Sequence, residues 1–161
     1  MYDVEIVIAD LNNSQHQSDI VAMTAAYALD PMGNGGPLPK DVLDRLIEGL
    51  CAHPTTIVFL AYIDNQPVGI ATCFRGFSTF YAKPLVNIHD LAILPDFRGC
   101  GIGRKLLAAI ESHARELNCC KVTLETQENN SRARALYEKV GFAQATYDPT
   151  AGGALFYAKI L

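Results

Sequence analysis

Residues Asn87–Lys105 read NIHDLAILPDFRGCGIGRK, and this stretch decides how the rest of the chain is interpreted. It begins with apolar, strand-forming residues, passes through a turn containing proline and a cluster of glycines, and ends where a helix is expected to begin. Glycines at such a junction free backbone N–H groups to face an anion, and the start of a helix adds a partial positive charge. The stretch therefore predicts a phosphate-binding loop.

The spacing of the glycines separates this loop from two common nucleotide-binding loops. A Rossmann fingerprint has the spacing G-x-G-x-x-G with an acidic residue about 20 positions later. Glu125 lies at a suitable distance, but the glycines fall at 99, 101 and 103. A P-loop continues with Lys and Ser or Thr, whereas Gly103 is followed by Arg104. A P-loop is excluded, and a dinucleotide-binding oxidoreductase is disfavoured.

Composition limits the class of protein. The chain has 161 residues, of which 50% are hydrophobic and 19% charged, as expected for one globular domain spanning residues 1–161. The formal net charge of -4 argues against nucleic acid as a partner and leaves room for a cationic or small neutral substrate.

Membrane, secretory and metal-binding signals are missing from the sequence. No apolar run approaches the roughly 20 residues of a membrane span, and MYDVEIVIAD has no basic region before its apolar residues, so a cytoplasmic protein is expected. No two histidines have metal-ligand spacing, so we expect no metal. The five cysteines are interpreted as reduced thiols that mostly pack; a redox role for the adjacent Cys119–Cys120 pair is the less favoured alternative.

Periodicity predicts the order of the elements. We expect strands at residues 4–8, 55–63, 67–77, 86–94, 121–127, 142–147 and 154–161, and helices at 16–29, 41–51, 101–117 and 130–140. The Gly- and Pro-rich stretch 30–39 is expected to be a mobile surface loop that selects substrate, and 78–84 a second loop. The order indicates a mixed α/β sheet in one domain.

Two motifs carry a resemblance to a known family. Residues 98–103 have the pattern R-x-x-G-x-G after an apolar strand. About 25 residues later the chain continues with Asn130-Ser131-Arg132-Ala133, Leu136-Tyr137-Glu138 and Gly141-Phe142. Together these resemble the two signatures of the GNAT superfamily of acetyl-CoA-dependent N-acetyltransferases. The resemblance implies an α/β fold with a mixed, mostly antiparallel central sheet flanked by about four helices.

The resemblance also implies how acetyl-CoA is bound. The pyrophosphate would lie on the loop and the first turn of the following helix, where Arg98 either pairs with phosphate or braces the loop. The pantetheine arm would pair with a strand backbone, and Asn130 would contact that arm, cap its helix, or do both. The implied cofactor-binding residues are Leu91, Ala92, Ile93, Arg98, Gly99, Cys100, Gly101, Ile102, Gly103, Arg104 and Asn130.

Tyr137 is the expected general acid. Asn130, Ala133 and Tyr137 fall on one face of a helix, and the resemblance turns this face toward the cofactor. A phenol has a pKa of about 10 and a thiol about 8.5, so the phenol can protonate or hydrogen-bond to the departing CoA thiolate. The alternative is a tyrosine packed in the core.

His89 is the expected base for the acceptor amine, which is mostly protonated at neutral pH because its pKa is about 10.4. Strand alternation places Asn87, His89 and Leu91 on one face and Ile88 and Asp90 on the other. An imidazole suits a base, although many relatives carry an acidic residue at this point. The alternative is a buried, hydrogen-bonded histidine. Asp90 would orient a neighbour, and Glu125 is a weaker candidate for the base.

The sequence therefore predicts direct transfer of the acetyl group to an amine held between residues 30–39 and 75–84, without a covalent enzyme intermediate. Three acidic residues near the first of these stretches slightly favour a cationic amine or polyamine: Asp30, Asp41 and Asp44. An amino acid, a protein N-terminus or a lysine remains an alternative acceptor, and a non-catalytic acyl-CoA sensor an alternative function. Strand 154–161 would let two copies pair as a homodimer if it lay at a sheet edge.

Overall fold

The computed structural model describes residues 2–161. Its chain forms two compact units, of which the first ends at Gln127 and the second runs from Glu128 to Leu161.

A five-stranded sheet forms the centre of the first unit. Its strands follow one another in chain order, β1-β2-β3-β4-β5, and their bounds are Glu5–Ile8, Thr56–Ile63, Gln66–Ser78, Lys83–Ile93 and Val122–Leu124. The first four strands pair antiparallel, and β5 pairs parallel to β4. The mixed, mostly antiparallel sheet expected from the sequence is confirmed.

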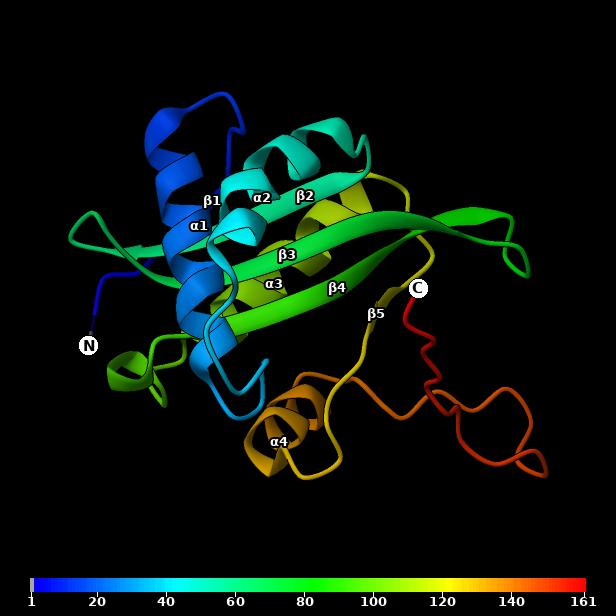
Figure 1. Cartoon of the computed structure of the whole chain (residues 1–161). Coiled ribbons are helices and arrows are strands. Elements are labelled where there is room, and N and C mark those ends of the chain that lie inside the picture. The colour runs from blue at the N-terminus through cyan, green and yellow to red at the C-terminus, as the bar shows by residue number, and fades with distance from the viewer. Residues whose placement is uncertain (1) are drawn as a thin grey trace. The chain divides into compact units, whose positions relative to one another are not determined.

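Helices cover both faces of this sheet. α1 (Ser14–Leu29) and α2 (Lys40–Ala52) lie on one face, and α3 (Ile102–Glu116) lies on the other (Figure 1). The side chain of Asn13 caps α1 by accepting from the amides of Gln15 and His16. A short 3₁₀ turn at Pro95–Phe97, which sequence periodicity did not predict, joins β4 to the glycine loop.

The core has one apolar layer on each face of the sheet. On the α1/α2 face the buried residues come from both helices and from three strands: Ile20, Met23, Leu50, Val58, Leu60, Ile70 and Ala92. On the α3 face, Leu106 and Ile110 are almost fully buried. A Cβ added at Gly69 would lie 2.8 Å from Ile93 and 3.3 Å from Leu106. Because that space is already filled, α3 packs tightly on the sheet.

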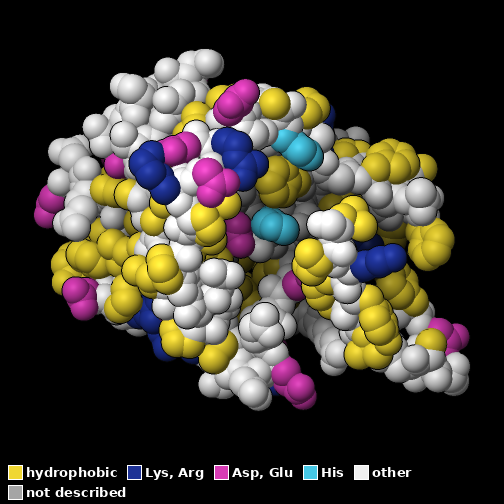
Figure 2. All heavy atoms as spheres, viewed as in Figure 1, with side chains coloured by type: hydrophobic (Ala, Val, Ile, Leu, Met, Phe, Trp, Pro, Cys, Tyr) yellow, Lys and Arg dark blue, Asp and Glu magenta, His cyan; other side chains and the backbone are white. Residues whose placement is uncertain are grey.

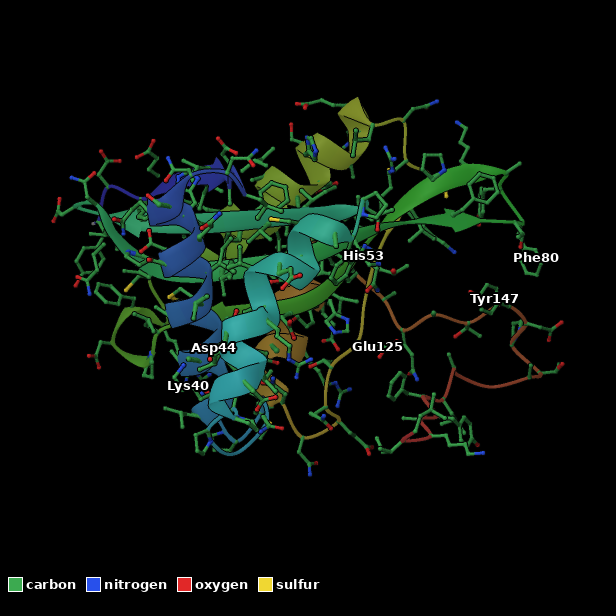
Figure 3. All side chains as sticks on the ribbon, turned by 45° about the horizontal axis from the view of Figure 1, so that its top comes forward. Lys40, Asp44, His53, Phe80, Glu125 and Tyr147 are labelled. Carbon is green, nitrogen blue, oxygen red and sulfur yellow. The ribbon has the colours of Figure 1, made fainter. Side chains whose placement is uncertain are left out.

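Strands β3 and β4 form a long hairpin with aromatic residues near its tip. Ser78 pairs with Lys83, so the expected loop is shorter than 78–84 and the strands continue farther. Phe80 is 85% exposed at this tip, well away from α2 (Figure 3). Acidic and basic side chains are mixed on the exposed side of α2 (Figure 2), where Lys40 pairs with Asp44 and Arg45 with Asp41.

The second unit contains α4 (Ser131–Lys139) and an extended C-terminal segment. α4 ends before Gly141, whose φ of +99° suits a helix terminus. No strand forms in residues 142–161, so the two strands predicted at 142–147 and 154–161 are wrong.

A long backbone hydrogen bond runs between these two stretches, from Ala154 N to Ala145 O at 3.4 Å. Apolar alternation predicted an extended backbone, but a strand also needs a neighbour that supplies a hydrogen-bonded ladder. The homodimer expected from pairing of strand 154–161 would need a strand, and residues 154–161 do not form one. No helix among residues 2–161 is long and apolar enough to cross a membrane.

Candidate functional site

Strand β4 contains a bulge at His89. In the pairing of β3 with β4, Thr72 lies opposite Asp90, and the next residue, Cys73, lies opposite Ile88. His89 is the extra residue between these pairs, so the alternation of side chains shifts by one position at this point.

The bulge overturns the expected distribution of side chains on β4. Ile88 and Asp90 were predicted to share a face, but their partners are consecutive residues of β3 and therefore face opposite sides. The ring of His89 contacts Phe74, with 5.6 Å between ring centroids, and Phe74 packs against the core under α1 and α2. His89 and Asp90 thus lie together on the α1/α2 side.

A second histidine adjoins the same phenylalanine. His53 caps the C-terminus of α2, and its ring lies 4.9 Å from Phe74, measured between centroids. The Thr55 hydroxyl lies 3.0 Å from Nδ1 of His53. This contact could not be predicted from the sequence, because α2 and β3 bring the two rings together from positions far apart in the chain.

Asp90 is half-buried, and its carboxyl has no hydrogen-bond or ion-pair partner among residues 2–161. Burial raises the pKa of its carboxyl above the ordinary value, and the neighbouring His89 charge partly offsets this rise. Burial also raises the pKa of the Tyr27 phenol on α1, with smaller contributions from the charges of Asp90 and Asp30. Tyr27 is a neighbour of the site that sequence reasoning missed.

One edge of β4 is open beyond the bulge. β5 pairs only with Val86, Asn87 and Ile88 of β4. From His89 to Ile93, β4 has β3 on one side and no strand of the described chain on the other. Backbone N–H and C=O groups on such an edge are available to an extended ligand. Leu91, Ala92 and Ile93, expected to bind pantetheine, all lie in this part.

The glycine loop presents unpaired backbone amides. No amide of residues 99–104 donates to a backbone carbonyl or side chain within residues 2–161. Gly99 and Gly101 have φ of +78° and +81°, and Gly101 is the N-cap of α3, without a capping side chain. The loop therefore leaves several N–H groups unpaired at the start of a helix, as an anion site requires.

Arg98 is held by two contacts at the start of this loop. Its Nε donates to the carbonyl of Ile93 at 3.0 Å, and a terminal nitrogen pairs with the Asp30 carboxylate. These contacts are those by which Arg98 would brace the glycine loop. Contact with phosphate stays a prediction.

The stretch between α1 and α2 has no helix or strand, as predicted, but it folds back on Asp30. The carbonyl of Asp30 accepts from the amides of Gly33 and Gly35, and its Oδ1 accepts from the amide of Met32 at 2.8 Å. Asp30 therefore joins this loop to Arg98.

In the second unit, α4 carries the remaining predicted residues. Asn130 caps α4 by accepting from the amide of Ala133 at 3.2 Å, so the capping role is confirmed. Tyr137 is buried, and its ring contacts Phe142 at 6.0 Å between centroids. The catalytic role of Tyr137 stays a prediction.

The other candidate groups are less distinctive. Glu125 lies one residue after β5 and is exposed. Cys119 and Cys120 are free thiols, as are the other three cysteines. No group of three or more His, Cys, Asp or Glu among residues 2–161 is arranged to hold a metal ion.

Comparison with known proteins identifies the family. The model of the acetyltransferase (GNAT) family matches residues 20–142, well over half of the chain. An uncharacterised N-acetyltransferase of Archaeoglobus fulgidus is 38% identical over 98 residues, which are 60% of this chain and 64% of the relative. The ribosomal protein bS18 alanine N-acetyltransferase of Haemophilus influenzae is 37% identical over 79 residues, 49% of each chain.

The fold extends the similarity to nearly the whole chain. The crystal structure of a probable acetyltransferase superposes with a TM-score of 0.80 at 18% identity, covering 97% of this chain and 99% of the other. The sequence matches, in contrast, span about half to two thirds of the curated relatives. The chain belongs to the GNAT family of acetyltransferases.

Proposed function

We propose that this protein transfers the acetyl group of acetyl-CoA to a small cationic amine or polyamine. One observation carries the proposal: the open edge of β4 runs from His89 and Asp90 at the bulge to the uncapped glycine loop. A single strand thus has features suited to the acceptor at one position and to the cofactor at the other.

The chemistry of this strand and loop fits acetyl-CoA. Unpaired amides of residues 99–104 would bind the pyrophosphate, and the backbone edge at Leu91–Ile93 would pair with the amide groups of pantetheine. Backbone donors on the same edge would stabilise the oxyanion that develops on the thioester carbonyl.

The transfer itself needs no covalent enzyme intermediate. The amine nitrogen attacks the thioester carbonyl, the carbon–sulfur bond breaks, and the CoA thiolate leaves. His89, directly or through water, takes the proton that the ammonium group must lose, with Glu125 or a water chain as the alternative. Tyr137, assigned from its motif, gives a proton or a hydrogen bond to the leaving sulfur.

Asp90 supports a cationic acceptor. It is a half-buried carboxylate without an ion-pair partner among the described residues, and it lies on the same side of β4 as His89. Holding such a charge away from water is costly, and an ammonium group would compensate for that cost. The chain's net charge of -4 favours the same class of acceptor.

The test is an acceptor screen with acetyl-CoA. Polyamines, aminoglycosides, amino acids and a peptide with N-terminal alanine are incubated with the protein, and acetylated products are measured by mass spectrometry. This readout avoids thiol reagents, which would also label the exposed Cys51 and Cys100.

We expect acetylation of di- or polycationic amines and little of the peptide. Preference for the peptide would refute the cationic-amine assignment. Thermal stabilisation by CoA with no acetylated product from any acceptor would indicate a sensor.

A further inference from the structure

We propose that the Arg98–Asp30 ion pair couples the acetyl-CoA loop to the α1–α2 loop, so that binding of the cofactor orders the acceptor side of the site. The two residues are positioning residues and need not touch either substrate. This inference rests on the proposed function, because it assumes that the glycine loop binds CoA.

Arg98 links three parts of the first unit. Its backbone begins the glycine loop, its Nε holds the carbonyl of Ile93 at the end of β4, and its terminal nitrogen reaches Asp30, 68 residues earlier in the chain. A ligand that fixes the glycine loop and the edge of β4 therefore fixes both ends of the arginine. Little freedom would then be left at the guanidinium.

Asp30 connects Arg98 to the α1–α2 loop through hydrogen bonds. Its carboxylate binds Arg98 through one oxygen and the amide of Met32 through the other, while its carbonyl binds the amides of Gly33 and Gly35. Gly33 also packs closely on the end of α1, where a Cβ at this position would lie 2.3 Å from the carbonyl oxygen of Tyr27. The bonds to Asp30 thus help to hold the loop in its present arrangement.

The surroundings of this ion pair set it apart from the others in the chain. The side chains of Arg98 and Asp30 are 28% and 17% exposed, whereas those of Lys40 and Asp44 are 86% and 57% exposed. Exposed pairs within one helix contribute little, because water and salt screen them. A partly buried pair between separate segments is screened less and holds those segments in one arrangement.

Such a connection must act in both directions. If CoA at the glycine loop strengthens the order of the α1–α2 loop, a ligand that orders the α1–α2 loop must strengthen CoA binding by the same factor. The coupling is expected in the typical range of about fivefold or more.

Amide hydrogen exchange of the full chain, with and without CoA, measures this coupling without a known acceptor. In the wild-type protein, we expect CoA to slow exchange at residues 99–104 and also, by about fivefold or more, at residues 31–36. In Asp30→Asn, protection at 99–104 should remain, while protection at 31–36 should be lost.

Matched variants separate the coupling from a loss of folding. Asp44→Asn breaks the exposed pair with Lys40, labelled in Figure 3, and should leave both responses to CoA unchanged. Arg98→Lys keeps the charge but loses the planar fork that holds Ile93 and Asp30 together, so it should weaken the response at 31–36. The reversed pair, Asp30→Arg with Arg98→Asp, should restore part of it.

The outcomes distinguish this inference from the proposed function. CoA protection at 99–104 without any change at 31–36 in the wild-type protein would overturn the coupling and leave the cofactor site intact. An unchanged response at 31–36 in Asp30→Asn would also overturn it. No protection at 99–104 at all would overturn the proposed function itself.

Discussion

At the scale of a residue, the burial of Asp90 has a consequence for stability. Burial raises the pKa of its carboxyl in the folded protein, so folding disfavours the ionised form. The folded state then binds more protons than the unfolded state between the two pKa values. The resulting penalty is absent below the ordinary aspartate pKa near 4, grows between the two pKa values and is complete above the raised one.

Asp90→Asn is therefore expected to raise the melting temperature at pH 7 and to lower acetylation of cationic amines. The gain in melting temperature should disappear as the pH approaches 4, because the wild-type carboxyl is then protonated and carries no charge. Thermal unfolding from pH 3.5 to 8 measures the first effect, and acceptor kinetics the second. A lower melting temperature at pH 7 would show that the carboxylate stabilises the fold instead.

His89 and Tyr137 should act on opposite limbs of the pH profile. His89→Ala is expected to lower kcat/KM by about 100-fold and to remove the acidic limb, because the base is lost. Tyr137→Phe is expected to lower it by a similar factor and to change the alkaline limb. The measurement is kcat/KM from pH 5.5 to 10 with the acceptor found in the screen. Unchanged profiles in both variants would remove these assignments.

The glycine loop matters at the scale of an element because its conformation restricts the residues it can contain. A Cβ at Gly99 would meet no atom within 4 Å, yet the φ of +78° disfavours any side chain. We expect Gly99→Ala to destabilise the protein by about 1–2 kcal/mol and Gly99→Asn by less, since asparagine tolerates left-handed backbone. Urea unfolding measures both, and equal losses would contradict this conformational cause.

Cys100 in the same loop provides a direct probe of cofactor binding. Cys100 and Cys51 are both exposed, and each thiol lies near a backbone carbonyl, at 3.7 and 3.8 Å. Acetyl-CoA should slow alkylation of Cys100 by about tenfold at ten times its Kd and leave Cys51 unaffected, because only Cys100 lies in the loop. Peptide mass mapping distinguishes the two sites, and equal rates at Cys100 with and without acetyl-CoA would exclude binding there.

Cys73 serves as an internal reference in that experiment. Burial, together with the nearby charge of Asp90, raises the pKa of its thiol to about 12. It should therefore remain unmodified until the protein unfolds.

The sequence predicts elements better than it predicts the contacts between them. The R-x-x-G-x-G pattern located the glycine loop, since its conformation depends on residues that are adjacent in the chain. The bulge at His89 escaped prediction because it depends on how β4 pairs with β3, a relation between two strands. The contact between Asp30 and Arg98 was missed for the same reason.

At the scale of the whole molecule, the two units differ in how their backbone groups are satisfied. The first has a five-stranded sheet with helices on both faces, whereas residues 142–161 of the second form no strand and expose large apolar side chains, among them Leu155, Phe156, Tyr157 and Ile160. Extended backbone without a hydrogen-bonded ladder opens readily.

Limited proteolysis should reveal this difference. Chymotrypsin is expected to cleave after Tyr147, Phe156 or Tyr157 at least about tenfold faster than anywhere in residues 2–127, because proteases cut segments that are already open. Mass spectrometry of the early fragments identifies the sites. Resistance of 142–161 equal to that of the sheet would indicate that this segment pairs in solution.

Fold class was predictable at this scale because apolar periodicity and segment order alone determine it, as the helices and strands before Gln127 show. The final two strands were not predictable, since apolar residues such as Phe156 favour extended backbone without specifying a partner.

The bulge of β4 also makes the site sensitive to chain length and not only to side-chain identity. Its geometry depends on one extra residue, His89, between two otherwise regular stretches of the ladder between β3 and β4. A one-residue deletion between Ile88 and Asp90 would restore regular pairing with β3 without disturbing either end of the strand. Such a deletion would remove His89, the expected base, while Ile88 and Asp90 kept their present partners on β3. The site therefore depends on the insertion of this residue as well as on the chemistry of its side chain.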